Sequence, residues 1–384
     1  MDATSLFLQR APLDVVFAQL PKPFDQRAQQ HFFTAAIEPY HAKYPPPLRY
    51  LKSFLKRVLK LLEQEGLDLE LIDEFAELAV ETSVKDFSST DDTEGSGYLV
   101  FQVNYPDNYD SALQLDVVSR QQQHQYQYQQ EQCTSDCNIQ KRVKNVLIRR
   151  NNYHNQVGMK LWKAGLLMAD FSINMSHLFR GRKVLELGSG TGVTGITLAA
   201  VCQPSTIYMT DFHDEVLRNL EYNANINIDN SVSEVVVSHL DWSTCSESDI
   251  RKLDSDILVA ADCTYSMDLC VIVLQTISSF LRYDNVSFST SAAVSGYEQW
   301  RRVALDTDKS TPPILFTSRK ICFLCFTIRA PETLEFFFNT LQSLREEITY
   351  TDVTEWVLQS CSTNSFFYEG GKEDLRVLCV VPAQ

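Results

Sequence analysis

The sequence lacks any apolar stretch close to the roughly 20 residues that a membrane-spanning helix needs. It also lacks the pattern of a secretory signal. Asp2, Arg10 and Asp14 interrupt the apolar residues of the first 20 positions, and no small-residue cleavage site follows. We therefore expect a cytoplasmic protein with no membrane partner.

Basic residues are scarce relative to acidic ones. The 384 residues include 34 Lys and Arg against 49 Asp and Glu, which gives a formal net charge of −15. A protein held on nucleic acid by phosphate contacts needs a basic footprint, so we expect no direct binding to nucleic acid. An acidic surface promotes solubility and is also compatible with a basic protein partner.

A cysteine pattern typical of a metal site is missing as well. Cys133 and Cys137 have no second pair near them. Cys322 and Cys325 lie three apart in an apolar run that predicts a strand, where residues three apart point to opposite faces. We therefore expect no metal, and buried free thiols in a reducing compartment.

What the chain does contain is a change of pattern along its length. Residues 1–83 carry apolar side chains at helical spacing and predict a helical N-terminal region. Residues 84–141 are polar and include the Gln-rich stretch 121–132, which predicts a linker or insertion. Residues 142–384 alternate strand and helix patterns, which predict an α/β domain with a mainly parallel sheet.

Six apolar runs in this last domain predict strands, at 183–187, 206–210, 234–240, 256–261, 319–327 and 375–381. Helical patterns lie between them, at 193–202, 213–226, 267–282 and 331–345. Residues 283–318 have no clear period, so we expect a surface insertion there.

The segment 184–192, VLELGSGTG, is the motif on which the chemistry depends. An apolar strand ends at Leu187, and a glycine-rich turn leads into a helix that begins near Val193. Glycines let the backbone approach a ligand closely, and the first turn of a helix offers free N–H groups to an anionic group such as a carboxylate. The turn lies at the carboxyl end of a strand, where open α/β sheets bind ligands. The candidate cofactor-binding residues here are Glu186, Gly188, Ser189 and Gly190.

The same segment contains Gly190-x-Gly192-x-x-Gly195, which matches the dinucleotide fingerprint and is weak evidence by itself. Glu186 inside the first strand favours S-adenosylmethionine over a nicotinamide cofactor. Asp211, at the end of the second strand, can accept hydrogen bonds from a ribose diol in either cofactor. The later strand ends therefore have to distinguish the two.

The third and fourth strands end in residues that favour S-adenosylmethionine. Asp241 and Trp242 match the exocyclic amine and the face of an adenine ring, although core packing is an alternative role for Trp242. Ala261 leaves room for a ligand beside its strand. Asp262 and Tyr265, three apart, can converge on a pocket, although Asp262 could instead cap the next helix.

Trp162 precedes a helix upstream of the first strand. Its ring can cover the mouth of the cofactor site, and its π face can attract a sulfonium cation. The alternative is a tryptophan in a satellite core.

Together these residues resemble the seven-stranded class I protein lysine methyltransferases of the methyltransferase-16 group. The motifs that carry the resemblance are Trp162, the E-x-G-x-G-x-G segment, Asp241-Trp242 and the D-x-x-Y of Asp262 to Tyr265. Within the group, the chain is similar to the elongation factor 2 lysine methyltransferases. Residues 41–63 and 71–82, the segment from Thr327 to Thr333 with Arg329, and the segment 366–369 support that similarity.

The resemblance implies a Rossmann-like domain that binds S-adenosylmethionine and methylates one lysine of translation elongation factor 2, ending at the trimethyl form. It implies that Asp262 and Tyr265 act at the acceptor amine. The sequence lacks an Asn-Pro-Pro-Tyr after the fourth strand, the feature expected for planar amide or base nitrogen acceptors. We expect a monomer. The alternatives are another protein lysine as the acceptor, a nicotinamide-dependent oxidoreductase, and a non-catalytic binding module.

Overall fold

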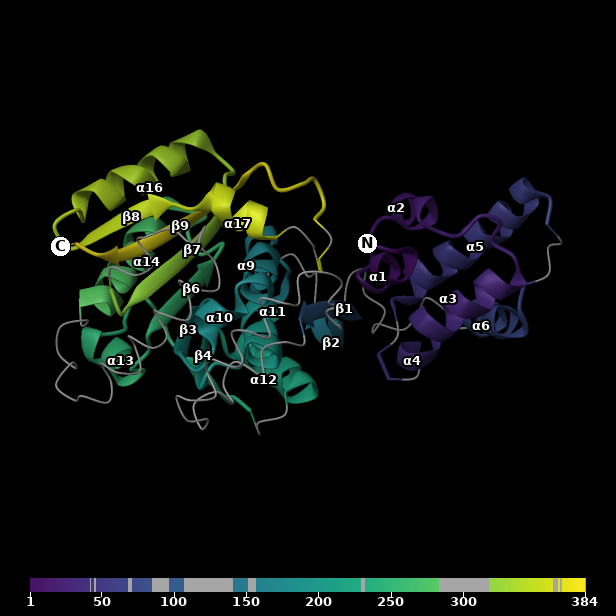
Figure 1. Cartoon of the computed structure of the whole chain (residues 1–384), viewed down its shortest axis with the longest axis horizontal. Coiled ribbons are helices and arrows are strands. Elements are labelled where there is room, and N and C mark those ends of the chain that lie inside the picture. Colours follow the sequence, from purple (N-terminus) through teal and green to yellow (C-terminus); the bar gives the residue numbers. More distant parts are fainter. Residues whose placement is uncertain are drawn as a thin grey trace, which may run out of the picture.

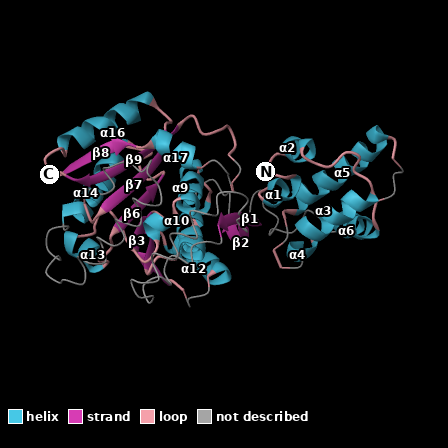
Figure 2. Cartoon of the chain, in the orientation of Figure 1, coloured by secondary structure: helices cyan, strands magenta, loops and turns pink. Residues whose placement is uncertain are grey.

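The structure is a computed structural model, drawn by element type in Figure 2. It describes residues 1–41, 43–44, 46–67, 71–84, 97–106, 141–150, 157–228, 232–282, 318–361, 365–366 and 368–383. The Gln-rich stretch 121–132, Cys133, Cys137 and nearly all of the expected insertion at 283–318 lie outside the described residues.

Seven strands of the second half of the chain form one sheet in the order β5-β4-β3-β6-β7-β9-β8. They are β3 (Lys183–Leu187), β4 (Thr206–Asp211), β5 (Glu234–His239), β6 (Ile257–Ala261), β7 (Ile321–Thr327), β8 (Ile348–Asp352) and β9 (Leu375–Pro382). Neighbouring strands are parallel except at β9, which runs antiparallel to both β7 and β8. The prediction of a seven-stranded, mainly parallel sheet is confirmed.

The strand β8 is the one member of the sheet that the apolar runs did not predict. Of its five residues only Ile348 is buried. The strand lies at the edge of the sheet and pairs with β9 alone, so most of its side chains face solvent. An edge strand of this kind needs no apolar run, because little of it belongs to the core.

Helices cover both faces of the sheet (Figure 1). One core contains residues of α9 (Lys163–Asn174), α10 (Ser176–Phe179), α11 (Val193–Thr197), η3 (Leu198–Cys202), α12 (Asp214–Asn227) and α17 (Thr354–Ser360). The other contains residues of α13 (Glu247–Lys252), α14 (Met267–Arg282) and α16 (Pro331–Ser343). Cys322 and Cys325 belong to different cores, and both are buried free thiols. The prediction that they point to opposite faces is confirmed.

The strand order reverses its direction of growth at β3. The chain places β4 and then β5 on one side of β3, and β6 and then β7 on the other. At such a reversal the loops that follow the neighbouring strands separate to opposite faces of the sheet, which leaves a crevice beyond the carboxyl ends. The glycine-rich turn after β3 and the loop after β6 therefore border one crevice.

The N-terminal helices form a helical region with its own core, as predicted. They are α1 (Ala3–Leu8), α2 (Leu13–Ala18), α3 (Gln26–Ala36), α4 (Glu38–His41), α5 (Leu48–Glu65) and α6 (Asp73–Val84). Phenylalanine rings lie at the centre of this core. The ring of Phe54 stacks on that of Phe32 at 5.2 Å and meets that of Phe7 at 4.7 Å. Each buried aromatic side chain contributes a large apolar area to the stability of this small region.

A two-stranded ribbon connects the helical region to the sheet domain. It consists of β1 (Gly97–Pro106) and β2 (Lys141–Arg150), paired antiparallel. The strand β1 lies within the range 84–141 that we expected to be a linker. Gln102 accepts a hydrogen bond from Ser5 of α1 at 3.1 Å, whereas Val146 and Ile148 are buried in the core of the sheet domain. The ribbon therefore contacts both parts of the chain.

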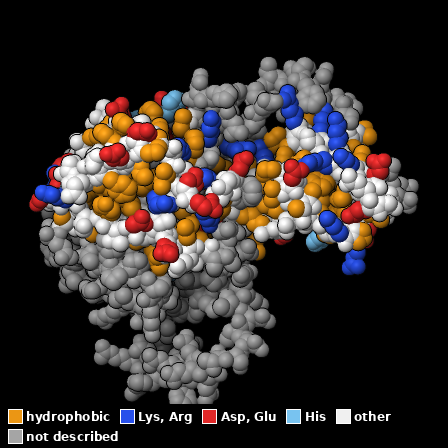
Figure 3. Space-filling view, turned by 90° about the horizontal axis from the view of Figure 1, so that it is seen from above, with side chains coloured by type: hydrophobic (Ala, Val, Ile, Leu, Met, Phe, Trp, Pro, Cys, Tyr) orange, Lys and Arg blue, Asp and Glu red, His pale blue; other side chains and the backbone are white. Residues whose placement is uncertain are grey.

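Positive charge is concentrated on α5. This helix carries five basic side chains between Arg49 and Lys60 and acidic ones only near its end. Figure 3 shows Lys and Arg side chains gathered over the N-terminal helices, on the right of that view. The net negative charge of the chain is therefore not spread evenly over its surface.

Candidate functional site

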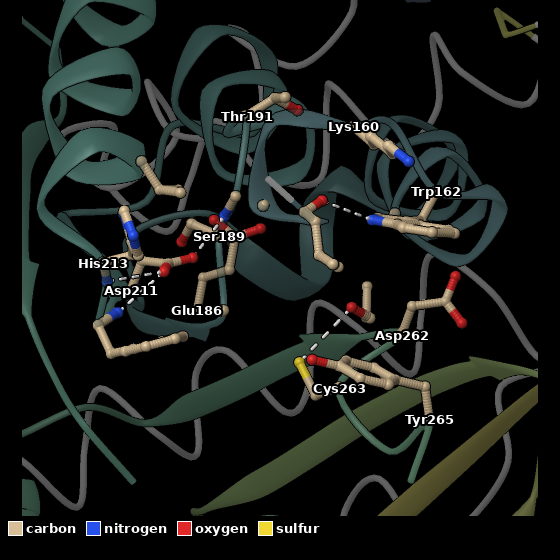
Figure 4. A pocket seen from close by; sticks show the side chains of 18 of the residues that line it. Lys160, Trp162, Glu186, Ser189, Thr191, Asp211, His213, Asp262, Cys263 and Tyr265 are labelled. Carbon is tan, nitrogen blue, oxygen red and sulfur yellow. Dashed lines mark hydrogen bonds between the residues drawn. The ribbon is translucent and has the colours of Figure 1, made fainter. Parts of the chain in front are cut away.

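A pocket with a volume of ≈ 450 Å³ lies beyond the carboxyl ends of β3, β4 and β6. Its size is within the range of small-molecule and cofactor sites. Figure 4 shows Asp211 and His213 at one end and Trp162 and Asp262 at the other. The structure brings every candidate residue to its wall, namely Trp162, Glu186, Gly188, Ser189, Gly190, Asp211, Asp241, Trp242, Ala261, Asp262 and Tyr265.

The glycine-rich turn follows β3 in a backbone conformation that only glycine adopts readily. Gly188, Gly190 and Gly192 have φ angles of 62°, 56° and 85°. A Cβ atom at Gly190 would lie 2.9 Å from the carbonyl oxygen of Gly158, in the short helix η2 (Val157–Met159). The turn is therefore in close contact with the backbone of η2, and a side chain at Gly190 has no space.

Glu186 is a residue of β3, and its side chain lies beneath this turn, next to the start of α11. A Cβ atom at Gly195 would lie 2.4 Å from its Oε2 atom, so the carboxyl group packs against the first turn of the helix. Burial raises the pKa of Glu186 to about 7, while the nearby hydroxyl of Ser189 and N–H of Gly195 oppose the rise. The carboxyl group is therefore part-protonated near neutral pH.

The pKa of Glu186 predicts a pH-dependent stability. Above the unfolded-state value of 4.5, the unfolded chain releases its proton before the folded chain does, so stability falls as the pH rises toward about 7. Glu186→Gln removes this titration. Urea denaturation should show the unfolding free energy of wild type falling relative to that of Glu186→Gln, by about 3 kcal/mol between about pH 5 and about pH 8. A constant difference over that range would contradict the raised pKa.

Asp211 ends β4 and faces the turn. Its Oδ2 atom accepts a hydrogen bond from the N–H of Gly190 at 3.1 Å. Its Oδ1 atom accepts from the N–H groups of Phe212 and His213 at 2.9 and 3.3 Å. The carboxylate therefore links the end of β4 to the glycine turn of β3 and has one face on the pocket.

Asp241 and Trp242 follow β5 at the pocket wall. Hydrogen bonds from the N–H and hydroxyl groups of Ser243 lower the pKa of Asp241, so this residue carries its negative charge at neutral pH. The ring of Trp242 packs against Gly188, where an added Cβ atom would lie 3.0 Å from it. Trp242 thus both lines the pocket and packs on a core cluster, so the two roles considered for it are not exclusive.

Asp262 follows β6 with a φ angle of 54°, and its carboxylate is enclosed by donors. The Oδ1 atom accepts from the N–H of Thr327 at 3.0 Å and lies 3.3 Å from Nη2 of Arg329. The Oδ2 atom accepts from the hydroxyl of Thr327 at 3.1 Å and from the N–H of Ala164 at 3.4 Å. The group therefore joins the ends of β6 and β7 to the start of α9. None of these bonds caps α14.

Arg329 is a residue of this site that our functional interpretation of the sequence missed. Its guanidinium carbon lies 4.9 Å from the ring centre of Trp162, while its Nη2 atom pairs with Asp262. The signal was present in the sequence as the segment from Thr327 to Thr333, which we used only as a mark of resemblance. Trp162 and Arg329 are far apart in the sequence, so the sequence alone did not indicate their contact.

Tyr265 is one of the exposed residues of the pocket wall, with 48% of its surface accessible. Within the described part of the chain, no hydrogen bond to its hydroxyl is found. Partial burial raises its pKa, so the phenol stays protonated at neutral pH. Its oxygen is therefore available both to donate and to accept a hydrogen bond in the pocket.

Among the residues that the structure describes, no group of three or more His, Cys, Asp or Glu side chains is arranged to hold a metal ion. The pocket wall also includes Lys160 and His213, which the motif analysis had not named.

Comparison with known proteins finds one family model and several curated relatives that match part of this chain. Residues 141–297 match the family model described as "Lysine methyltransferase". A stretch of 133 residues is 31% identical to the protein-lysine N-methyltransferase EEF2KMT of Mus musculus, covering 32% of this chain and 40% of that protein. The human protein of the same name is 26% identical over 49% of this chain and 51% of its own length. A calmodulin-lysine N-methyltransferase of Arabidopsis thaliana is 28% identical over 36% of this chain and 45% of its length. The chain thus spans about half the length of these curated relatives, or less.

Proposed function

We propose that this chain is a member of the lysine methyltransferase family and transfers a methyl group from S-adenosylmethionine to a lysine of translation elongation factor 2. The observation that carries the proposal is the convergence of all eleven candidate residues on one pocket. The three relatives compared above all carry a lysine methyltransferase name, and two of them are named EEF2KMT.

The charges of the pocket favour S-adenosylmethionine over a nicotinamide cofactor. Its described wall contains four carboxyl groups, those of Glu186, Asp211, Asp241 and Asp262, against the side chains of Lys160 and His213. S-adenosylmethionine has a sulfonium and an ammonium group, which this surface attracts. A dinucleotide would place the two negative charges of a pyrophosphate there instead, at a cost in electrostatic energy.

Different residues of the pocket would hold different parts of the cofactor. The glycine turn and the first N–H groups of α11 would receive the amino-acid end, Asp211 the ribose hydroxyls, and Asp241 with Trp242 the adenine. Bound S-adenosylmethionine supplies an electrophilic methyl group. We propose that Glu186, Gly188, Ser189, Gly190 and Ala261 also contact the bound cofactor.

The acceptor end has to present an uncharged amine. A free lysine has a pKa of about 10.4, and removal from water beside positive charge lowers that value. Tyr265 has the free hydroxyl with which to orient the amine. Asp262, whose oxygens already accept from Thr327 and Ala164, would hold the loop that carries Tyr265 in place. The main contribution of the protein would be this positioning.

Radiolabelled methyl transfer tests the substrate. Purified protein, labelled S-adenosylmethionine and unmodified elongation factor 2 should give label in the factor. The label should be absent when each lysine is blocked by acetylation beforehand, because an amide nitrogen no longer accepts a methyl group. Calmodulin is the comparison substrate, since one relative is a calmodulin-lysine N-methyltransferase. Label in calmodulin but not in elongation factor 2 would transfer the proposal to another protein lysine.

Calorimetry decides between the remaining functions. Binding of NAD without binding of S-adenosylmethionine would favour an oxidoreductase. Binding of S-adenosylmethionine with no methylation of any protein in a lysate would favour a non-catalytic module.

Within the described residues, no helix is long and apolar enough to cross a bilayer. We propose a monomer that acts in the cytoplasm, where elongation factor 2 works.

A further inference from the structure

Three asparagines on α12 hold the free edge of the β1–β2 ribbon. Asn219, Asn223 and Asn227 recur every four residues and therefore share one face of the helix. The amide of Asn227 bonds both the N–H and the carbonyl of Leu147, each at 2.7 Å. The amide of Asn223 does the same at Arg149, at 2.9 and 3.0 Å. The side chains thus satisfy this edge as a neighbouring strand would.

Asn223 makes one bond that the other two lack. Its Nδ2 atom also donates to the carbonyl oxygen of Thr191 at 2.9 Å. Thr191 belongs to the glycine turn and lines the pocket (Figure 4). Asn223 is fully buried, so loss of its amide would remove this donor from the carbonyl of Thr191, whereas the carbonyl of Arg149 would keep a bond from Nδ2 of Asn219 at 3.1 Å. One side chain therefore joins the ribbon edge to the cofactor turn.

A second contact from α12 reaches the same turn. A Cβ atom at Gly192 would lie 2.4 Å from Cδ1 of Leu220, so the turn rests directly on the helix. Leu220 and Asn223 are one helical turn apart. The helix α12 therefore positions the glycine turn by packing as well as by a hydrogen bond.

The ribbon is held from its other side by the N-terminal helical region. Arg10 donates a hydrogen bond to the carbonyl of Tyr98, and the ring of Tyr44 meets that of Tyr98 at 4.9 Å. The hydroxyl of Tyr98 lies 2.7 Å from that of Tyr222 on α12, whose ring lies under the guanidinium of Arg149 at 3.9 Å. Contacts thus run without a break from the N-terminal helices through the ribbon to α12.

We propose that Asn223 is a positioning residue for the cofactor, which ties the docked ribbon to the Thr191 carbonyl of the glycine turn. By this route the N-terminal half of the chain contributes to cofactor binding, although the described pocket wall begins at Val157. The inference rests on the proposed function, because the ligand concerned is S-adenosylmethionine or its product S-adenosylhomocysteine.

Asn223→Ala and Asn227→Ala form a matched pair for the test. Both remove two bonds to the ribbon edge, but only Asn223→Ala removes the bond to Thr191. Calorimetry with S-adenosylhomocysteine should show a Kd about tenfold higher for Asn223→Ala and within about twofold of wild type for Asn227→Ala. Both variants should lose thermal stability, so a stability loss alone cannot produce the difference in Kd.

Hydrogen exchange of the ligand-free proteins gives a readout that does not need the cofactor. The amides of residues 188–193 should exchange faster in Asn223→Ala than in Asn227→Ala. Equal Kd values and equal exchange in the two variants would overturn the proposal. If wild type bound no S-adenosylhomocysteine, the proposed function would fall, while the exchange comparison would still decide the role of Asn223. Asn223→Ser and Asn227→Ser repeat the comparison if the alanine variants do not fold.

Discussion

Gly190→Arg is expected to abolish binding of S-adenosylmethionine, raising its Kd by more than about a hundredfold. The new Cβ atom would lie 2.9 Å from the carbonyl oxygen of Gly158, and this atom is backbone that cannot rotate away. The φ angle of 56° adds strain for any residue with a side chain. The guanidinium would enter the pocket beside Asp211, whose carboxylate accepts from the Gly190 N–H. Calorimetry with the cofactor measures the loss.

Gly181→Arg is the matched control for this change. Gly181 has a similar φ angle of 68°, but a Cβ atom there would meet no atom within 4 Å. It precedes β3 and so lies at the end of the strand opposite to the pocket. Its variant should keep the cofactor affinity of wild type with a comparable backbone strain. Retained binding by Gly190→Arg would mean that the glycine turn is not the cofactor site.

Asp262→Ala is expected to lower kcat by about a hundredfold while the Kd of S-adenosylmethionine changes by less than about threefold. The reason is geometric. Removing the carboxylate frees the Arg329 guanidinium and leaves the N–H and hydroxyl of Thr327 without acceptors. The loop that carries Tyr265 then loses its anchor at the acceptor end. Steady-state kinetics at saturating cofactor, with calorimetry beside it, separates the two effects.

Asp256→Ala controls for the loss of a buried carboxylate. Asp256 immediately precedes β6, pairs with Arg182 and Arg319, and is as enclosed as Asp262, but lies at the opposite end of the same strand. Its variant should be destabilised without a fall in kcat. If Asp262→Ala turned over like wild type, the residue would leave the site. If Asp256→Ala lost as much activity, the fall in kcat would report stability alone.

The prediction of the sheet from the sequence succeeded where strands are buried. In β3, β6 and β7 almost every residue faces a core, so an apolar run marks the strand. The prediction missed β8, whose side chains mostly face solvent, and the ribbon strands β1 and β2, which lie in or beside polar sequence. The apolar pattern indicates which residues are buried, so it does not predict a strand that is held mainly by backbone pairing.

The members of the site were also predictable, because the chemistry of a strand end is local. The glycine turn, Asp211, Asp241 and Asp262 each follow a strand directly, and parallel strands bring their carboxyl ends to one edge. What each side chain does there was less accessible. The carboxylate of Asp262 lies at the pocket, as expected, but its position in the sequence did not indicate that donors from β7 and α9 enclose it.

The sequence by itself determined the alternation of strands and helices, the glycine turn and eleven residues of the pocket wall, because each depends on residues a few positions apart. Only the tertiary structure decided the raised pKa of Glu186, the enclosure of Asp262 and the bond from Asn223 to Thr191. These contacts join residues 98 positions apart at Ala164 and Asp262, 65 at Asp262 and Thr327, and 32 at Thr191 and Asn223. Burial and long-range contact follow from how whole elements pack, and no local pattern encodes them.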